Sequence, residues 1–292
     1  MKILKSALDS SVNFVFDSGV ECRFVQRSAE YFIIYVSSHN GCNKACRFCH
    51  LTQLKQTDYD STHFSGYVEQ VRAVLDYWKN NIYKGIDPVK VHVNFMARGE
   101  PLDNPVVRNM WGHLSTTIDK MIKEATGVNE VRFKISTILP KTIEDKQALV
   151  ANFNRGVKPD IYYSMYSQDK DFRKQWIPKA MSISESLELI KEFMNNSIRV
   201  TFHHALIKHE NSNLTDAKEF VSVLRQHDIV GARFNLVRYN PHSSAQGEEA
   251  SDKQIMNYLS VLTDSGIFSN IKTIPKVGLD IAAACGMFIK TK

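Results

Sequence analysis

Three cysteines, Cys42, Cys46 and Cys49, lie within eight residues of the sequence, and Phe48 precedes the last thiol. Thiolates this close together either bind a metal or repel one another. A structural zinc site takes four protein ligands, usually in two separated pairs, and iron–sulfur clusters are usually held by four cysteines. No fourth cysteine lies near the triplet in the sequence. A four-iron cluster held here would keep one iron free for a small molecule, so the spacing predicts a catalytic cluster.

Composition limits the classes of protein to consider. The chain has 292 residues, of which 43% are hydrophobic, with a formal net charge of +6 and five cysteines. A small, odd number of cysteines argues against a disulfide scaffold and favours reduced thiols in the cytoplasm. The first residues lack the apolar segment of a signal peptide, and no apolar run approaches the ~20 residues of a membrane span. We therefore expect a soluble, cytoplasmic protein. The charge fits a solvated basic face as well as a surface for a polyanion.

Short β-type runs alternate with amphipathic stretches through most of the chain. This alternation predicts parallel strands joined by right-handed helical crossovers. About six such units make an α/β partial (β/α)6 barrel rather than a closed eight-stranded one. The expected strands are 31–36, 90–96, 130–136, 160–166, 199–206 and 233–239. The expected helices are 63–81, 104–124, 141–152, 182–195, 214–227 and 251–265.

Three regions are expected around this barrel. Residues 1–30 predict an N-terminal β extension, in which Asp17-Ser18-Gly19 is a turn between two apolar runs. Residues 31–240 form the barrel core, and residues 241–292 form a C-terminal extension with one helix, one strand and Cys285.

Polar residues follow the predicted strands at the edge where function is concentrated in parallel α/β sheets. The cysteine triplet follows the first barrel strand directly. Other polar groups fall at the ends of later strands, namely Gly99-Glu100-Pro101, Ser136, Ser164, Tyr166 and Asn240. Since the ends of parallel strands meet at one edge, we expect these groups to surround a common site.

Several short motifs, in a fixed order, resemble the RlmN/Cfr RNA methyltransferases of the radical S-adenosylmethionine (radical SAM) superfamily. The triplet with its aromatic residue is typical of the superfamily, and the segments 99–104 (GEPLDN) and 280–286 (DIAAACG) point to this subgroup. The other matching segments are 36–42 (VSSHNGC), 135–137 (IST), 177–178 (IP) and 239–241 (YNP). The resemblance extends from about residue 12 to residue 287. The resemblance does not include the family's N-terminal helical accessory domain, which aids RNA binding, and we expect this domain to be absent.

The resemblance implies a 4Fe–4S cluster on the triplet and S-adenosyl-L-methionine as cosubstrate. The open iron would chelate the amino and carboxylate groups of S-adenosylmethionine, and one-electron reduction would give a 5′-deoxyadenosyl radical. Gly99 and Glu100 would receive the ammonium group. The remaining implied contacts to S-adenosylmethionine are Ser136, Ser164 and Asn240, with the backbone of Met165 and Tyr166 holding the adenosine.

The resemblance also implies a role for Cys285, which by its sequence context alone would be a small buried residue. In the family the matching cysteine accepts a methyl group, loses a hydrogen atom to the radical, and the resulting methylene radical adds to an adenine carbon. Carbon 2 is preferred here over carbon 8. Gly286 would let the loop bring the thiol to the substrate. Glu21 resembles the acidic residue that removes a proton; by itself it would be a solvated strand carboxylate.

The sequence departs from the family at Tyr35, which stands where the family has a second cysteine. A phenol cannot form the disulfide that a thiol forms, and Cys22 on the neighbouring ribbon is a candidate substitute. Tyr166 stands where the family commonly has histidine. Adjacent strand residues point to opposite faces, so His203 and His204 cannot chelate one metal together. His50, one residue after the triplet, is expected to line the cluster pocket.

Three functions are consistent with these features. The first is a radical SAM methyltransferase acting on an adenine carbon of rRNA or tRNA, with a flavodoxin-like electron donor. The second keeps the cofactors but has another substrate or radical outcome, because the partner cysteine is replaced by Tyr35. The third is a metal-binding protein without enzymatic activity. An RNA partner would be held by phosphate contacts, for which the candidates are Arg23, Arg27, Lys170, Arg173, Lys174 and Lys179.

Overall fold

The computed structural model describes residues 1–291 and contains one ten-stranded sheet, whose strands follow one another in chain order. The first four strands form an antiparallel ribbon, and from the fourth strand onward every pairing is parallel. The ribbon consists of β1 (Lys2–Lys5), β2 (Ser11–Val15), β3 (Glu21–Ser28) and β4 (Tyr31–Tyr35). The parallel strands that follow are β5 (Lys90–Phe95), β6 (Glu130–Thr137), β7 (Asp160–Tyr163), β8 (Val200–Ala205), β9 (Arg233–Val237) and β10 (Asn270–Ile274).

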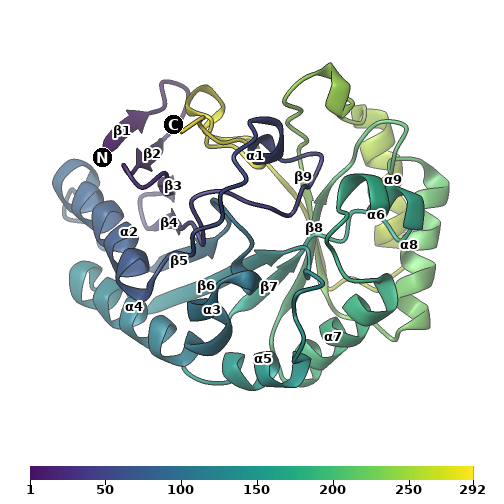
Figure 1. Cartoon of the computed structure of the whole chain (residues 1–292), viewed down its shortest axis with the longest axis horizontal. Coiled ribbons are helices and arrows are strands. Elements are labelled where there is room, and N and C mark those ends of the chain that lie inside the picture. Colours follow the sequence, from purple (N-terminus) through teal and green to yellow (C-terminus); the bar gives the residue numbers. More distant parts are fainter. Residues whose placement is uncertain (292) are drawn as a thin grey trace.

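Helices connect the parallel strands and form an arc around the outside of the sheet (Figure 1). The helices are α1 (His50–Gln53), α2 (Phe64–Tyr77), α3 (Pro105–Asn109), α4 (Trp111–Thr126), α5 (Lys146–Phe153), α6 (Lys170–Trp176), α7 (Ile183–Asn195), α8 (Leu214–Gln226) and α9 (Asp252–Asp264). The predicted α/β partial barrel is therefore confirmed. Within residues 1–291, no helix has the length and apolar character needed to cross a membrane.

Side chains alternate along the barrel strands between an apolar outer face and a polar inner face. On β5, Val91, Val93 and Phe95 are completely buried toward the helices, whereas the alternate residues are His92 and Asn94. Successive strand residues point to opposite faces of a sheet, and the register extends the polar face sideways, because Asn94 pairs with Tyr35 on one side and Lys134 on the other. The outer face holds the core, while the inner face remains polar.

Local sequence explains where the helices begin. Ser182 caps α7 in a capping box with Glu185. The stretch 104–124 was expected as one helix, but the chain forms two, α3 and α4, separated at Met110. Asn104 caps α3 by accepting hydrogen bonds from two backbone amides, and Met110 has a non-helical φ of −125°. The break turns the chain so that Trp111 enters the core.

The number of strands and helices differs from the expectation. β10 pairs in parallel with β9, so the strand of the C-terminal extension continues the barrel sheet, which has seven parallel strands from β4 to β10 rather than six. β1 and α6 were not predicted. β1 is a four-residue edge strand with lysine at both ends, and α6 has only seven residues, so neither carries a clear periodic signal.

Candidate active site

The cysteine triplet lies on the loop that follows β4, which we call the triplet loop (residues 36–49). Its three thiols line a cavity of about 120 Å³ together with Gly99, Glu100, Ser136 and Ser164, which come from the ends of the next three strands. Gly41 allows the loop to turn, because a Cβ atom there would lie 2.3 Å from the Asp58 carbonyl oxygen. The residues expected at one edge of the sheet thus do surround a common cavity.

The donor chemistry of this cavity fits an iron–sulfur cluster. Three thiols line it, and its described lining contains no fourth cysteine and no histidine. Burial raises the pKa of Cys42, Cys46 and Cys49, and a metal would displace their protons. Within residues 1–291, no three Cys, His, Asp or Glu side chains are arranged as ligands of a single metal ion.

Glu100 places a carboxylate beside the three thiols. The side chain is 5% exposed, and its two oxygens accept hydrogen bonds from the backbone amides of Leu102 (3.1 Å) and Ile138 (3.2 Å). Burial raises the pKa of Glu100 to about 7, and the nearby Asp103 adds to the shift. Gly99 has a φ of +90°, and a Cβ atom there would lie 2.4 Å from the His39 ring. A buried, partly unbalanced carboxylate of this kind favours binding of a cationic group.

A second, smaller recess of about 30 Å³ adjoins the first and contains Cys285, Tyr166 and Asn240. Phe48 lines both cavities and stacks on the Tyr166 ring with a centroid distance of 4.3 Å. The Asn240 side chain donates to the Cys285 carbonyl (3.0 Å), and the His50 amide donates to the Gly286 carbonyl (2.9 Å). The segment that carries Cys285 is therefore bonded both to the loop after β9 and to the first residue of α1, which directly follows the triplet loop.

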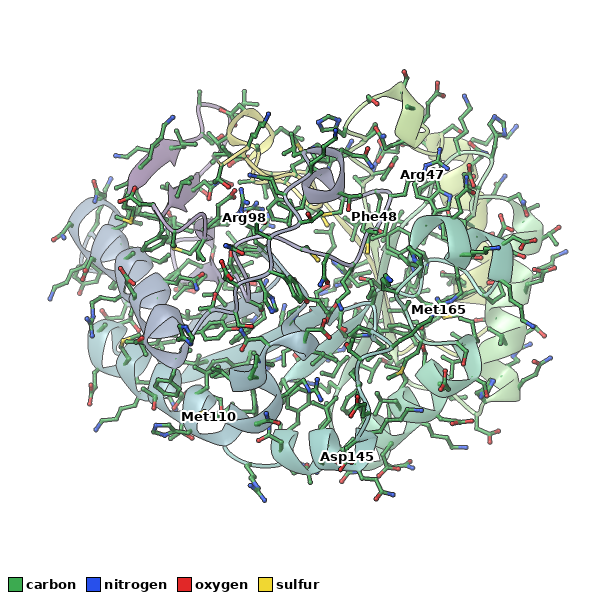
Figure 2. All side chains as sticks on the ribbon, in the orientation of Figure 1. Arg47, Phe48, Arg98, Met110, Asp145 and Met165 are labelled. Carbon is green, nitrogen blue, oxygen red and sulfur yellow. The ribbon has the colours of Figure 1, made fainter. Side chains whose placement is uncertain are left out.

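Cys285 lies at the surface of the protein, with its thiol in a recess. The residue is exposed at the surface, but the surrounding walls remove enough water from the thiol to raise its pKa to about 11, while Arg23 opposes this shift. Met165 lies differently. Its side chain is completely buried in the core, and its carbonyl accepts a hydrogen bond from Arg173. Figure 2 shows Arg98, Phe48 and Met165 inward of Met110 and Asp145, which lie directly before the outer helices α4 and α5.

Comparison with known proteins identifies the family. The dual-specificity RNA methyltransferase RlmN of Sulfurimonas denitrificans is 30% identical, and the match covers 90% of this chain and 68% of the relative. The RlmN of Nautilia profundicola is 28% identical, with 87% and 67% covered. The chain belongs to the RlmN family of radical SAM methyltransferases. It spans between 61% and 68% of the length of these and two further RlmN relatives.

The fold agrees with this assignment. A radical SAM methyltransferase from Sphaerobacter thermophilus superimposes with a TM-score of 0.75 at 19% identity, covering 98% of this chain and 80% of the other. No protein-family model matches the chain.

Cys22, the candidate substitute for the cysteine that Tyr35 replaces in the RlmN pattern, is wrong. Cys22 is completely buried, and its thiol donates to the Gln70 carbonyl of α2 (3.4 Å). It therefore points to the helix side of β3. Tyr35 lies close enough to Cys285 for that thiol to raise the tyrosine pKa, which burial already raises. The position of the missing cysteine is thus occupied by a phenol on the Cys285 side of the sheet.

Several other expectations need correction. Arg23 and Arg173 are 3% and 7% exposed, and their guanidinium groups donate to backbone carbonyls of the protein, so neither can contact a phosphate. His50 lies outside the described lining of the triplet cavity and contacts the Asn240 carbonyl at 3.0 Å. His203 and His204 are placed as expected on opposite faces, with His203 against Tyr162 and His204 against Phe220.

Glu21 lies in a setting that the sequence did not indicate. Its carboxylate is completely buried and is bound by the side chains of Arg98, Arg23 and Asn13. Proton transfer through Glu21 stays a prediction.

Sequence reasoning also missed a buried ion pair between Lys44 and Asp103 beside Cys42, and the hydrogen bond from Tyr59 to Asp103 (3.0 Å). Lys44 is the only basic residue within the triplet motif before Cys46, which is the one signal that pointed to it.

Proposed function

We propose that this protein methylates an adenine carbon of RNA, with carbon 2 as the preferred position and Cys285 as the group that carries the methyl. The observation that supports it most directly is the placement of Cys285 in a recess that shares Phe48 with the cavity of the three thiols. Relatives at 28–30% identity over most of this chain are named dual-specificity RNA methyltransferases.

The proposed cofactors are a 4Fe–4S cluster and S-adenosylmethionine, which together supply a methyl group and a carbon-centred radical. Cys42, Cys46 and Cys49 would hold the cluster, and the cavity-lining Glu100 would receive the ammonium group with the backbone at Gly99. The remaining proposed contacts are Ser136 and Ser164 in the same cavity, and Asn240 with the Met165–Tyr166 backbone on the side of the second recess.

Cys285 must lose its proton before its sulfur can accept a methyl group from the sulfonium, with S-adenosylhomocysteine leaving. The thiolate is the nucleophilic form, and burial makes it scarce at neutral pH, while the charge of Arg23 favours it. Activation of an aromatic adenine carbon then needs radical chemistry, because that carbon is too weakly nucleophilic for direct methyl transfer.

An RNA substrate is supported by the basic side chains that remain available. Lys170, Lys174 and Lys179 are exposed on and after α6, and Arg27 is half-buried at the end of β3. Phosphate contacts from these residues would make RNA binding salt-dependent, and the target adenine would have to leave its stack to reach the recess. We propose a flavodoxin-like protein as the electron donor and the cytoplasm as the location.

The test is mass spectrometry of Cys285 and of RNA. Protein produced with its cluster should carry a methyl group on Cys285, and RNA from cells that express it should gain methyladenosine. The Cys46→Ser variant, which lacks one predicted ligand, should do neither. An unmodified Cys285 in cluster-loaded protein would refute the methyl-carrier role.

A second candidate function is favoured by Tyr35, which stands where the family has its second cysteine and whose pKa is raised by burial and, to a smaller extent, by Cys285. If the partner cysteine is needed to release methylated RNA, the same chemistry serves another substrate. The outcome that identifies this case is a methylated Cys285 together with unchanged RNA.

A further inference from the structure

A buried group of three charged residues lies beneath Cys285. Glu21 on β3 receives hydrogen bonds from Arg98 Nε (2.9 Å) and from Arg23 Nη2 (3.2 Å), and a second Arg98 nitrogen bonds the same carboxylate. The side chains of Glu21 and Arg98 are completely buried, and that of Arg23 is 4% exposed. We call these three residues the Glu21 network. Its charges are out of water and are bound to one another.

The network holds the segment around Cys285, which we call the Cys285 loop (residues 282–289). Arg23 donates to the carbonyls of Ala283 and Met287, both at 2.8 Å. Arg98 donates to the Ile289 carbonyl, and the Ile289 amide donates to Glu21 (3.2 Å). These contacts lie on both sides of Cys285 in the sequence, so the network fixes the loop before and after the thiol.

Aromatic packing adds to these hydrogen bonds. The ring of Phe288 lies 4.9 Å from the Arg23 guanidinium and 5.8 Å from that of Arg98. A guanidinium near an aromatic ring is attracted to it, and more strongly where water is excluded. Figure 1 shows the same arrangement at the level of the chain, with the yellow C-terminal segment beside the purple N-terminal strands.

Arg98 also joins the Cys285 loop to the first cavity. Its Nη1 donates to the carbonyl of Asn40 in the triplet loop (3.0 Å), and its backbone amide donates to Ser37 Oγ (3.1 Å). The next two residues in the sequence are Gly99 and Glu100, which line the cavity of the three thiols. One residue thus connects the triplet loop, the Gly99–Glu100 turn and the Cys285 loop.

We propose that Glu21, Arg23 and Arg98 are positioning residues that fix the Cys285 thiol relative to the cavity of the three cysteines. The inference rests on the proposed function in that Cys285 is taken as the reacting group. A buried ion pair contributes little net stability compared with apolar packing, because both charges lose their hydration. The planar guanidinium offers five donors in a fixed geometry. Arg23 and Arg98 use several of these donors to hold backbone carbonyls from distant segments, although Arg23 Nε has no partner among the described residues. The network therefore contributes to the position of the Cys285 loop more than to the stability of the protein.

The test compares the variants Arg98→Met, Arg98→Lys and Glu21→Gln/Arg98→Met with the unaltered protein. The double variant removes one negative and one positive charge, so the net charge of the network is unchanged, although Arg23 loses its ion pair with Glu21. Hydrogen–deuterium exchange of peptides covering residues 282–289 reports the mobility of the loop, and mass spectrometry reports the rate at which iodoacetamide modifies Cys285. Neither measurement requires cofactor or turnover.

We expect hydrogen–deuterium exchange of the Ile289 amide to be faster by about tenfold or more in the double variant. The amide loses its hydrogen bond to a charged carboxylate, and a loss of this kind has an effect of that size. Cys285 should be alkylated several-fold faster, because the loop no longer holds the thiol in its recess. Arg98→Lys should fall between the double variant and the unaltered protein, since a lysine keeps the charge near Glu21 but cannot reach all of the carbonyls.

Arg173→Met is the matched control, because Arg173 is also a buried arginine, but it bonds carbonyls at 165, 167 and 181. It should leave exchange at 282–289 unchanged. Alkylation of Cys285 is not compared for this variant, because Tyr166, which lies between two of these carbonyls, lines the recess. A folded double variant with unaltered loop exchange and thiol reactivity overturns the proposal, and Arg98→Lys decides the case if the double variant does not fold. Failure of Cys285 to become methylated in the unaltered protein would instead contradict the proposed function.

Discussion

The two faces of the barrel sheet differ sharply in chemistry. On the outer face, Trp111 packs against Phe95, Phe133 and Phe153, with each ring centroid at 5.5 Å. On the inner face, Lys134 lies 5.0 Å from the Tyr162 ring. Closed α/β barrels fill their interior with branched apolar side chains, but this open sheet does not. The comparison teaches that folding energy comes from the helix side, while the other side is kept polar for ligands.

The inner face also carries polar atoms that the protein itself does not satisfy. Among the described residues, His92 Nε2 and Asn94 Oδ1 are buried and have no hydrogen-bond partner. Such atoms are expensive in a face that serves only stability. Atoms of the same kind occur on the helix side, at Tyr67 Oη and in the His204 ring, so they do not distinguish the two faces.

The largest effect should come from breaking the outer face. Trp111→Ala removes a completely buried side chain whose Nε1 donates to the Val157 carbonyl (2.8 Å). We expect unfolding free energy to fall by about 3–5 kcal/mol, the usual range for a large core residue changed to alanine. Urea unfolding measures it. The neighbouring Met110, which is 45% exposed, provides the control, and Met110→Ala should change stability by less than about 0.5 kcal/mol. Equal effects of the two changes would contradict the assignment of the core.

A change at the edge of the sheet should affect binding more than stability. Glu100→Gln keeps the shape of the side chain but removes the charge proposed to receive the ammonium of S-adenosylmethionine. Loss of a charged hydrogen bond is typically about 1.5–3 kcal/mol, so affinity should fall by about tenfold to a hundredfold. Anaerobic equilibrium dialysis of cluster-loaded protein measures this. Glu124→Gln, at an exposed position on α4, should leave the affinity unchanged. If the two variants bind equally well, Glu100 does not receive the ammonium.

The smallest effect is expected on the polar inner face. There a substitution should raise the stability of the protein, whereas Trp111→Ala lowers it. Burial lowers the pKa of Lys134 from 10.5 to about 8. Between these values the unfolded chain binds more protons, so stability of the unaltered protein should rise with pH from about 8 to 10.5, and the full penalty applies below 8. Lys134→Met removes the penalty but also the contact with Tyr162. It should therefore stabilise the protein by about 1–2 kcal/mol at pH 7, with a smaller gain at pH 9.5.

Urea unfolding at both pH values checks the prediction for Lys134. Lys120→Met, at a position that is 75% exposed, should show no such dependence on pH. A Lys134→Met protein that is less stable than the unaltered one at pH 7 would show that the polar face contributes to folding.

Sequence patterns predicted most strands and helices because the signals for them lie in neighbouring residues. Strand alternation on β5 and the Ser182 cap of α7 are both readable from a few neighbouring residues. The cavity-lining residues could also be grouped in advance, since the ends of parallel strands must meet; their roles stay predictions. Cys22 was a wrong candidate because successive strand residues point to opposite faces. Its neighbour Arg23 points toward the Cys285 loop, whereas Cys22 points toward α2.

The Glu21 network could not be predicted in the same way. Glu21 and Arg98 are 77 residues apart, and Glu21 and Ile289 are 268 apart. No periodicity links such positions, and a charged residue on a strand usually indicates a solvated position. Only the packing of the folded chain shows that these charges are buried together.

The order of the strands has a consequence for how the protein is made. Each strand pairs with the one before it in the chain, so the sheet can grow as the polypeptide leaves the ribosome. The hydrogen bonds from Arg23 to Ala283 and from Ile289 to Glu21 cannot form until residues near the end have been translated. A nascent chain can thus build its sheet and its thiol-lined cavity while Cys285 is still unattached, so the proposed reacting thiol joins the site after the residues of that cavity.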